Sequence, residues 1–265
     1  MGEAKRLIVQ PIASKDANKI VRALHYSGKV ATTSKLHLGV FLNGKCGGVM
    51  QFGDPIDKRK LLPLVKSTPW NGFLELNRMA FADWLPRNSE SRCLSVAFRW
   101  IKKQYPHLQW VVSFADGCQC GDGTIYRASG FILTNIVANK TMWRLPSGEV
   151  IADLITRQVW NDSTRKRLGF IMGESWKTFA ERSGAVRLLG FQLRYIYFLD
   201  PTARQRLTVP VLPFSEIDRR GAGMYRGKSI QRAEGETKDT LAIHAREGGS
   251  LPTSALHISS EVRNG

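Results

Sequence analysis

The chain has 265 residues, 43% of them hydrophobic and 9% aromatic, which is enough apolar material for one sizeable core. Its 39 Lys and Arg residues exceed its 22 Asp and Glu residues and give a formal net charge of +17. Such a charge attracts polyanions and predicts a nucleic-acid partner, although a basic surface can also serve solubility or adhesion to ribosomes or lipid headgroups. No apolar run reaches the roughly 18 residues of a membrane span and no signal peptide is evident, so we expect a cytoplasmic protein without a membrane partner.

The first part of the chain predicts a strand, a helix and a hairpin. Leu7–Ile12 has the composition of a short strand. The apolar residues after it recur at helical spacing, with Ser14 as a candidate cap and an end near His25–Gly28. Two β-rich runs then flank Asn43 and Gly44, the strongest short signal for a β-hairpin.

The middle of the chain predicts a βαβ unit. The apolar run Gly72–Phe81 predicts an extended strand. After a break in the pattern, Asn88 or Ser89 can cap the helix that follows. Apolar residues then recur at helical spacing up to Tyr105, and the near-continuous apolar run Leu108–Asp116 suits a strand buried on both faces.

The last part of the chain predicts a short helix closed by Gly130, a strand, a mixed segment and a further strand. The mixed segment, roughly residues 140 to 184, contains one amphipathic helix around Trp176 and Phe179. From about Arg219 onward the chain has few large apolar residues, which predicts a flexible basic extension. We therefore expect a catalytic domain over residues 1–216 and a tail over residues 217–265.

The four cysteines form no C-x-x-C pair and no repeated spacing, so the sequence predicts reduced thiols and neither a disulfide framework nor a zinc finger. Cys118 and Cys120 lie in a Gly-rich turn, where a soft metal could bind. A single intervening residue is poor spacing for zinc, which argues against that alternative.

The predicted order of elements resembles the GNAT acyltransferase fold, an α+β architecture with a mixed, mostly antiparallel central sheet flanked by helices. Four motifs make the resemblance more specific: LELNRMAF, RNSESR at the start of a helix, WVVSFADG and IYRASGF. Together they resemble the Mom family of phage DNA-modification proteins over roughly Leu7–Pro213. The resemblance implies an enzyme with acyltransferase-like chemistry, encoded by a phage or prophage.

The turn before the central helix is the place where an acyl donor such as coenzyme A would bind. In GNAT enzymes a Gly-rich turn holds the pyrophosphate of coenzyme A with backbone N–H groups and the positive helix end. Here the turn reads RNSESR, without glycines and with the acidic Glu90, which weakens the case for coenzyme A. Asn88, Ser91 and Arg92 can still hold a phosphate of coenzyme A, a transfer RNA or DNA, and the alternative is a plain helix cap.

The resemblance marks five further positions as functional: His25, Tyr26, Arg78, Asp116 and Tyr126. It implies catalytic roles for His25, Tyr26, Asp116 and Tyr126, and we expect all five to converge on one cleft beside the start of the Ser91 helix. An imidazole, a carboxylate and a tyrosinate would make a hard site suited to iron, from His25, Tyr26 and Asp116. The alternative is a structural histidine.

Two of these regions have a chemical rationale of their own. Tyr126 takes the place of the tyrosine that GNAT enzymes often use as general acid toward the leaving thiolate, unless it is a packed core residue. Glu75, Asn77 and Arg78 alternate with apolar residues, so we expect the three polar groups to point to one face of a central strand. Burying such a row is costly, which favours a pocket for substrate or donor.

The resemblance implies the conversion of adenine in DNA to N6-carbamoylmethyladenine, which would protect phage DNA from host restriction by altering the major groove. The enzyme would have to extrude an adenine from double-stranded DNA. Tyr26, Trp84 or Trp100 could stack on the base, or could simply be core residues. Basic residues before and on the central helix could hold the backbone: Arg87, Arg92, Arg99, Lys102 and Lys103.

The acyl donor and two other functions stay open. Simple acyl transfer leaves an amide, whereas a glycyl unit has the same atoms as a carbamoylmethyl group. We therefore hypothesise an aminoacyl donor such as glycyl-tRNA, which would make tRNA a partner, with acetyl-coenzyme A as the alternative. The other functions are a GNAT N-acetyltransferase acting on a protein or small molecule and a non-catalytic nucleic-acid-binding protein.

Overall fold

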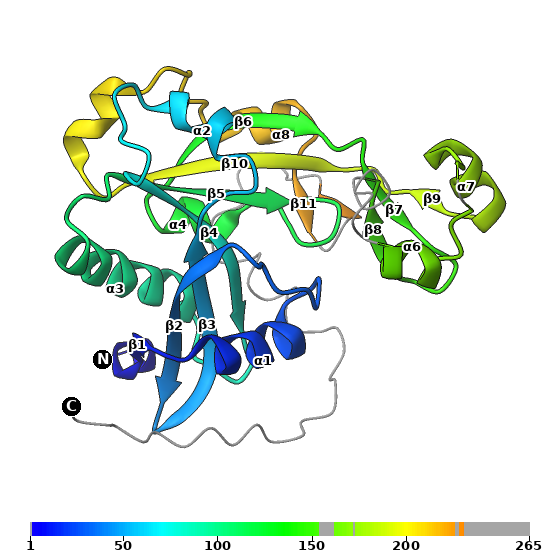
Figure 1. Ribbon diagram of the computed structural model, residues 1–265. Coiled ribbons are helices and arrows are strands. Elements are labelled where there is room, and N and C mark those ends of the chain that lie inside the picture. Colours follow the sequence, from blue (N-terminus) through cyan, green and yellow to red (C-terminus); the bar gives the residue numbers. More distant parts are fainter. Residues whose placement is uncertain (1, 154–161, 172, 226–227, 231–265) are drawn as a thin grey trace.

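The computed structural model describes residues 2–153, 162–171, 173–225 and 228–230. A seven-stranded sheet with the order β1-β2-β3-β4-β5-β10-β6 runs through the molecule (Figure 1). Its strands are β1 (Ile8–Pro11), β2 (Ser34–Leu42), β3 (Lys45–Gly53), β4 (Phe73–Phe81), β5 (Trp110–Asp116), β10 (Phe191–Phe198) and β6 (Ile132–Ala138). Neighbouring strands are antiparallel except for β4 and β5. The predicted α+β, GNAT-like architecture with a mostly antiparallel sheet is confirmed.

The β2–β3 hairpin turns where the sequence predicts. Leu42 pairs with Lys45 across a two-residue turn. Asn43 and Gly44 have φ angles of 52° and 78°. Positive φ at both central residues is the geometry that an Asn-Gly turn favours, because its twist matches that of the flanking strands.

Helices cover both faces of the sheet. On one face, α1 (Ser14–Leu24) buries an apolar stripe against β3 and β4, with Ala17, Val21 and Val49 fully buried. On the other face, α3 (Ser89–Gln104) and α4 (Thr124–Ala128) pack on the largest core. Shorter helices join them: η1 (Glu3–Arg6), α2 (Lys58–Leu61), η2 (Leu62–Leu64), η3 (Pro201–Arg206) and α8 (Ser215–Arg219).

The predicted helix caps are only partly right. Ser14 is the first residue of α1 and follows Ala13, and no side chain caps this helix. Asn88 precedes α3, but it adopts a left-handed conformation with a φ of 67° and its side chain makes no capping bond. The hydroxyls of Ser89 and Ser91 instead donate backward, to the carbonyls of Pro86 and Asn88, which ties the turn to itself.

The parallel pair β4–β5 is short. It extends from Phe73 and Trp110 to Glu75 and Val112. Beyond these residues the two strands diverge, as Figure 1 shows. Side chains from both faces of the sheet can therefore meet at this place, and the polar residues discussed below lie around it.

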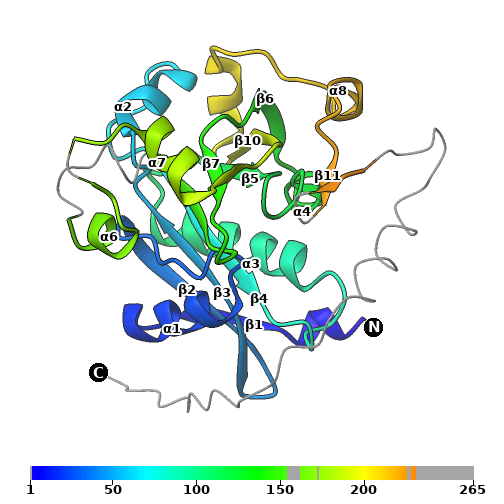
Figure 2. The ribbon, with the colours of Figure 1, turned by 90° about the vertical axis from the view of Figure 1, so that its right-hand side faces the viewer.

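Residues 139–190 form an insertion between β6 and β10. It contains the small sheet β8-β7-β9, formed by β7 (Met142–Arg144), β8 (Val150–Ala152) and β9 (Val186–Arg187), together with α6 (Asp162–Arg167) and α7 (Trp176–Ser183). The rings of Trp143 and Phe179 both pack against Trp176, so the predicted amphipathic helix is present. Figures 1 and 2 show α6 and α7 on the opposite side of the molecule from α3.

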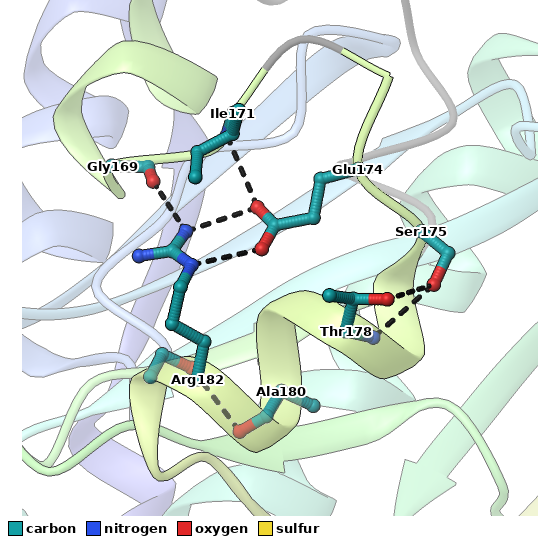
Figure 3. A network of polar contacts seen from close by, with 8 residues as sticks. Gly169, Ile171, Glu174, Ser175, Thr178, Ala180 and Arg182 are labelled. Carbon is teal, nitrogen blue, oxygen red and sulfur yellow. Dashed lines mark hydrogen bonds and ion pairs between the residues drawn. The ribbon is translucent and has the colours of Figure 1, made fainter.

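A network of hydrogen bonds connects α7 to the loop that precedes it (Figure 3). Ser175 caps the helix by accepting a 3.1 Å hydrogen bond from the Thr178 backbone N–H. Arg182 donates two hydrogen bonds of 2.9 Å to the carboxylate of Glu174 and one of 2.7 Å to the carbonyl of Gly169. These bonds of the Arg182 guanidinium connect the last turn of α7 to the loop that precedes the helix.

The folded part of the chain extends beyond the predicted boundary at residue 217. Ile217 and Ala222 are fully buried in the main core, and β11 (Met224–Tyr225) pairs with β12 (Lys228–Ser229). Local composition did not reveal these contacts, because so few apolar residues contribute to them. The predicted tail over residues 231–265 lies outside the described residues. None of the described helices is long and apolar enough to cross a membrane.

Candidate functional site

Six polar side chains from four segments meet where β4 and β5 diverge. We call them the central cluster: His25, Tyr26, Glu75, Arg78, Asp116 and Tyr126. The phenol of Tyr26 interacts electrostatically with Asp116 and Tyr126. Arg78 interacts with His25, and Glu75 with Tyr126. The structure thus brings together the five positions that the family resemblance marks, and adds Glu75.

A β-bulge places two members of the cluster on one face of β4. Gln51 of β3 pairs with Arg78, and the next residue, Phe52, pairs with Leu76, so Asn77 has no partner across the strands. Residues three apart on a regular strand face opposite sides. The extra residue restores Arg78 to the face of Glu75, and so a guanidinium and a carboxylate lie on the same side.

Arg78 is anchored by two carbonyl groups. Its Nε donates a 2.7 Å hydrogen bond to the carbonyl of Lys29, and its Nη1 donates a 2.6 Å bond to its neighbour Asn77. The amide oxygen of Asn77 accepts a 3.1 Å bond from Ser34, and its side chain also hydrogen-bonds Glu75. Asn77, predicted to bind substrate or donor, is therefore buried and occupied by protein groups.

The carboxyl of Glu75 is the group in the cluster that titrates near neutral pH. Burial raises the pKa of Glu75 to about 7, although Arg78 and the hydrogen bond with Asn77 oppose the shift. A carboxyl with this pKa can exchange a proton at physiological pH, which an exposed glutamate cannot do efficiently. The sequence pattern assigned Glu75 to a pocket for substrate or donor, but it gave no indication that the carboxyl titrates near neutral pH.

His25 follows the last residue of α1 and holds a turn. Its Nδ1 lies 2.8 Å from the hydroxyl of Ser27 and accepts a 3.2 Å bond from the Ser27 N–H. Burial, and secondarily the charge of Arg78, lower the pKa of His25 to about 4. The imidazole is therefore neutral at pH 7, and its ring packs on Tyr26 with centroids 4.2 Å apart.

The two tyrosines stay protonated. Burial of the phenol oxygen, and secondarily the carboxylate of Asp116, raise the pKa of Tyr26 far above its usual value, although the residue as a whole is 49% exposed. Burial raises the pKa of Tyr126 to about 12, against a hydrogen bond with Ser113 that lowers it. The ring of Tyr126 packs against Phe131 and Tyr195. Its phenol is thus held at a fixed place as a proton donor.

Asp116 ends β5 with a fixed carboxylate. Its Oδ1 accepts a 2.9 Å bond from the Cys118 backbone N–H, and its Oδ2 accepts a 2.9 Å bond from the amide of Gln119. The thiol of Cys120, in the same turn, interacts with both Tyr26 and Tyr126. The turn 116–120 therefore forms one wall of the cluster.

The residues predicted to bind iron do not fit such a site. Both carboxylate oxygens of Asp116 accept hydrogen bonds from protein groups, and the positive charge of Arg78 opposes a second cation at His25. The raised pKa of Tyr26 opposes the tyrosinate that iron would need.

The turn before α3 is held by hydrogen bonds within itself, from Ser89 to Pro86 and from Ser91 to Asn88. In the described ranges, no hydrogen bond or ion pair joins Asn88, Ser91 or Arg92 to a cluster residue. The Nε of Arg92 is buried without a hydrogen-bond partner among the described residues. Burial and the nearby Asp83 raise the pKa of Glu90. The predicted phosphate contacts of this turn stay a prediction.

The other predicted DNA contacts occupy the outside of α3. Arg99, Lys102 and Lys103 are exposed there. Trp84 is 40% exposed with the amine of Lys45 over its ring, and Trp100 packs against Tyr105 and the main core. This surface lies away from the insertion (Figures 1 and 2).

Sequence reasoning missed Lys29, Ser113 and Gln119. Each contacts a cluster residue: Arg78, Tyr126 and Asp116, respectively. The only available signal was the polar Ser113 inside an otherwise apolar strand. Lys29 and Gln119 lie in loops, where sequence spacing does not reveal which groups will be neighbours.

Residues 6–216 match the Mom protein family. The methylcarbamoylase mom of Escherichia phage Mu is 35% identical over 205 residues, which cover 77% of this chain and 80% of that protein. The match contains every residue of the central cluster.

Solved acyltransferases are similar at the level of the fold. The spermidine/spermine N-acetyltransferase SpeG of Vibrio cholerae has a TM-score of 0.43 and 7% identity, covering 77% of this chain and 98% of that chain. FeeM, an N-acyl amino acid synthase from uncultured soil microbes, has a TM-score of 0.41 and 13% identity, covering 77% and 96%. At this distance neither protein indicates a substrate or a donor.

Proposed function

Because the chain belongs to the Mom protein family, we propose that it is a transferase that modifies the exocyclic amine of adenine in double-stranded DNA. The observation that carries the proposal is the central cluster, in which a carboxyl, a guanidinium and a phenol from distant segments interact. Burying such groups costs free energy, and a catalytic or binding role would explain why the protein bears that cost. The net charge of +17 suits a polyanionic substrate.

The groups divide the acid and base work between them. The adenine N6 is a poor nucleophile because its lone pair is delocalised into the ring, so it needs a base when it attacks a carbonyl. Glu75, with a pKa of about 7, is the candidate base. Tyr126, with a pKa of about 12, is the candidate acid toward the leaving group.

The remaining members orient and stabilise. The guanidinium of Arg78 is fixed by the carbonyls of Lys29 and Asn77, and it can stabilise negative charge on the attacked carbonyl oxygen. The carboxylate of Asp116 can accept a hydrogen bond from the extruded base. The half-exposed ring of Tyr26, beside it, offers a surface on which the base can stack.

The product we propose is N6-carbamoylmethyladenine, in keeping with the name of the phage Mu relative. A glycyl unit transferred to N6 has the same atoms as this group, so a charged tRNA followed by rearrangement is one donor. The alternative donor is a thioester such as acetyl-coenzyme A, with its diphosphate at the start of α3. It would leave N6-acetyladenine and release the free thiol, because an acetyl unit lacks the nitrogen of the carbamoylmethyl group. The altered amine would block major-groove reading by host restriction enzymes.

The test is mass analysis of nucleosides from cells that express the wild type, Asp116→Asn or Tyr126→Phe. We expect a modified adenosine only with the wild type. Labelled glycine and labelled acetate, fed separately, identify the donor by the nitrogen and carbon that enter the base. Unmodified DNA in all three cultures, with soluble protein present, would reject the proposed function.

A further inference from the structure

We propose that the described part of the insertion, residues 139–153, 162–171 and 173–190, carries the surface that binds the DNA backbone next to the target base. This proposal rests on the proposed function, because it names the element that holds the substrate of that reaction. The sequence pattern pointed instead to α3. Three features favour the insertion over α3 as the DNA-binding surface: its position, its charge and its exposed apolar side chains.

The stem of the insertion lies against Asp116. The backbone N–H of Asn139, where the insertion begins, donates a 2.8 Å bond to the carbonyl of Gly190, where it ends. Gly190 packs so closely on Cys118 that a Cβ there would lie 2.8 Å from the Cys118 sulfur. Cys118 in turn donates its N–H to Asp116. Both ends of the insertion are therefore fixed beside one wall of the central cluster.

The insertion also reaches the cluster from the side of Arg78. The amine of Lys29 donates a 3.2 Å hydrogen bond to the carbonyl of Val150 and lies 3.7 Å from the carboxylate of Glu149, both in the insertion. The carbonyl of Lys29 accepts the bond from Arg78. The insertion thus borders the cluster at two places that are far apart in sequence.

The charge of the insertion is positive and unevenly compensated. Its sequence has nine Lys or Arg residues against five Asp or Glu residues. Three of its acids already have basic partners: Glu149, Glu174 and Glu181. In the residues that the structure describes, no ion pair engages the exposed cations Lys140, Arg144 and Arg187. These three are available for phosphates.

Apolar side chains stand exposed among these cations. The side chains of Leu189 and Val186 are 79% and 65% exposed. Arg144 lies directly opposite Val186 across β7 and β9, so the two share a face. Cations next to exposed apolar groups suit a duplex whose bases are partly unstacked, because phosphates and base surfaces are then both accessible.

Contacts with residues that are hydrogen-bonded to the cluster favour the insertion over α3. An extruded adenine stays attached to its sugar, so the cations that hold its backbone must border the central cluster. The insertion meets this condition through Cys118 and Lys29. The helix α3, which carries Arg99, Lys102 and Lys103, lies on the opposite side of the molecule from α6 and α7 (Figures 1 and 2).

The experiment compares two full-length triple variants with the same change in charge. The first carries Lys140→Gln, Arg144→Gln and Arg187→Gln, and the second carries Arg99→Gln, Lys102→Gln and Lys103→Gln. Binding of a fluorescent DNA duplex is measured by anisotropy between about 50 and 200 mM NaCl. We expect the insertion variant to bind at least about tenfold more weakly and its salt slope to fall by about two to three, because each lost phosphate contact removes about one unit. The α3 variant should bind as the wild type does.

Each other outcome overturns the proposal in a recognisable way. Equal losses in both variants would mean that only total charge matters, and a loss in the α3 variant alone would place DNA there. A loss of binding to an RNA hairpin without a loss for duplex DNA would make the insertion an RNA surface. If the wild type does not bind duplex DNA, the proposed function fails first. Unchanged melting temperatures show that both variants are folded, as expected for exposed side chains.

Discussion

Glu75 and Arg78 share one face of β4 because the strand contains an extra residue, Asn77, opposite the pair Gln51 and Phe52 of β3. The guanidinium lowers the pKa of the carboxyl against the stronger effect of burial, which still leaves it at about 7. The bulge therefore determines where the Arg78 guanidinium lies relative to Glu75. It thereby affects the pH range in which the Glu75 carboxyl can exchange a proton.

Glu75→Gln should separate activity from stability. The unfolded pKa is near 4.5 and the folded pKa about 7, so the folded protein binds more protons between these values and its stability falls as the pH rises through this window. The glutamine variant lacks this loss and should be more stable than the wild type by about 2 kcal/mol at about pH 8. Urea unfolding at about pH 5 and pH 8 measures it.

The same variant should lose DNA modification by a factor of about 10² or more, as expected for a general base. The wild-type activity should rise with pH around 7 and stay level up to about pH 10, because Tyr126 is still protonated there. A Glu75→Gln protein with full activity and an unchanged acid limb would remove Glu75 from the mechanism.

Arg78→Gln should shift the titration of His25. The charge of Arg78 contributes to the low pKa of about 4, so its loss should raise that value, while burial keeps it below the usual 6.5. Arg78→Lys retains the charge but cannot donate to the carbonyls of Lys29 and Asn77 in the same geometry, so the His25 pKa should stay low. NMR titration of the imidazole distinguishes the two variants.

Both Arg78 variants should modify DNA at least about tenfold more slowly, since a displaced guanidinium cannot stabilise the transition state. An unchanged His25 titration in Arg78→Gln would show that the two residues do not interact in solution. Arg99→Gln, which removes an exposed cation from α3, is the matched control and should change neither measurement.

Tyr126→Phe should remove the acid without disturbing the core. The ring contacts with Phe131 and Tyr195 remain, and the lost hydrogen bond to Ser113 should cost about 1 kcal/mol of unfolding free energy. Turnover should fall about 10²-fold. Ser113→Ala loses the same bond but keeps the phenol, so it should retain most activity; equal turnover losses in the two variants would assign Tyr126 a structural role.

Gly190→Ala tests the stem of the insertion. A Cβ at this position, whose φ is 156°, would lie 2.8 Å from the sulfur and 3.0 Å from the backbone nitrogen of Cys118. The turn that holds Asp116 must then move, which should lower both thermal stability and DNA modification. Gly148→Ala is the control, because Gly148 also has positive φ, at 84°, but nothing within 4 Å of a Cβ. It should lower stability by about 1 kcal/mol and leave modification intact.

The amino-acid sequence was sufficient for those features that arise from neighbouring residues. The turn at Asn43 and Gly44, the apolar stripe of α1 and the buried run of β5 all follow from local spacing and conformational preference. The family motifs likewise marked Arg78 and Asp116 as candidates for the site.

The tertiary structure decided which groups become neighbours. The bulge at Asn77 depends on how β4 pairs with β3, the pKa of Glu75 depends on what buries it, and the approach of the insertion to Asp116 depends on the packing of Gly190 against Cys118. Strand register and electrostatic environment arise from contacts between segments that are distant along the chain. Spacing within one segment carries no information about them, which is why the DNA surface expected on α3 and the one proposed on the insertion differ.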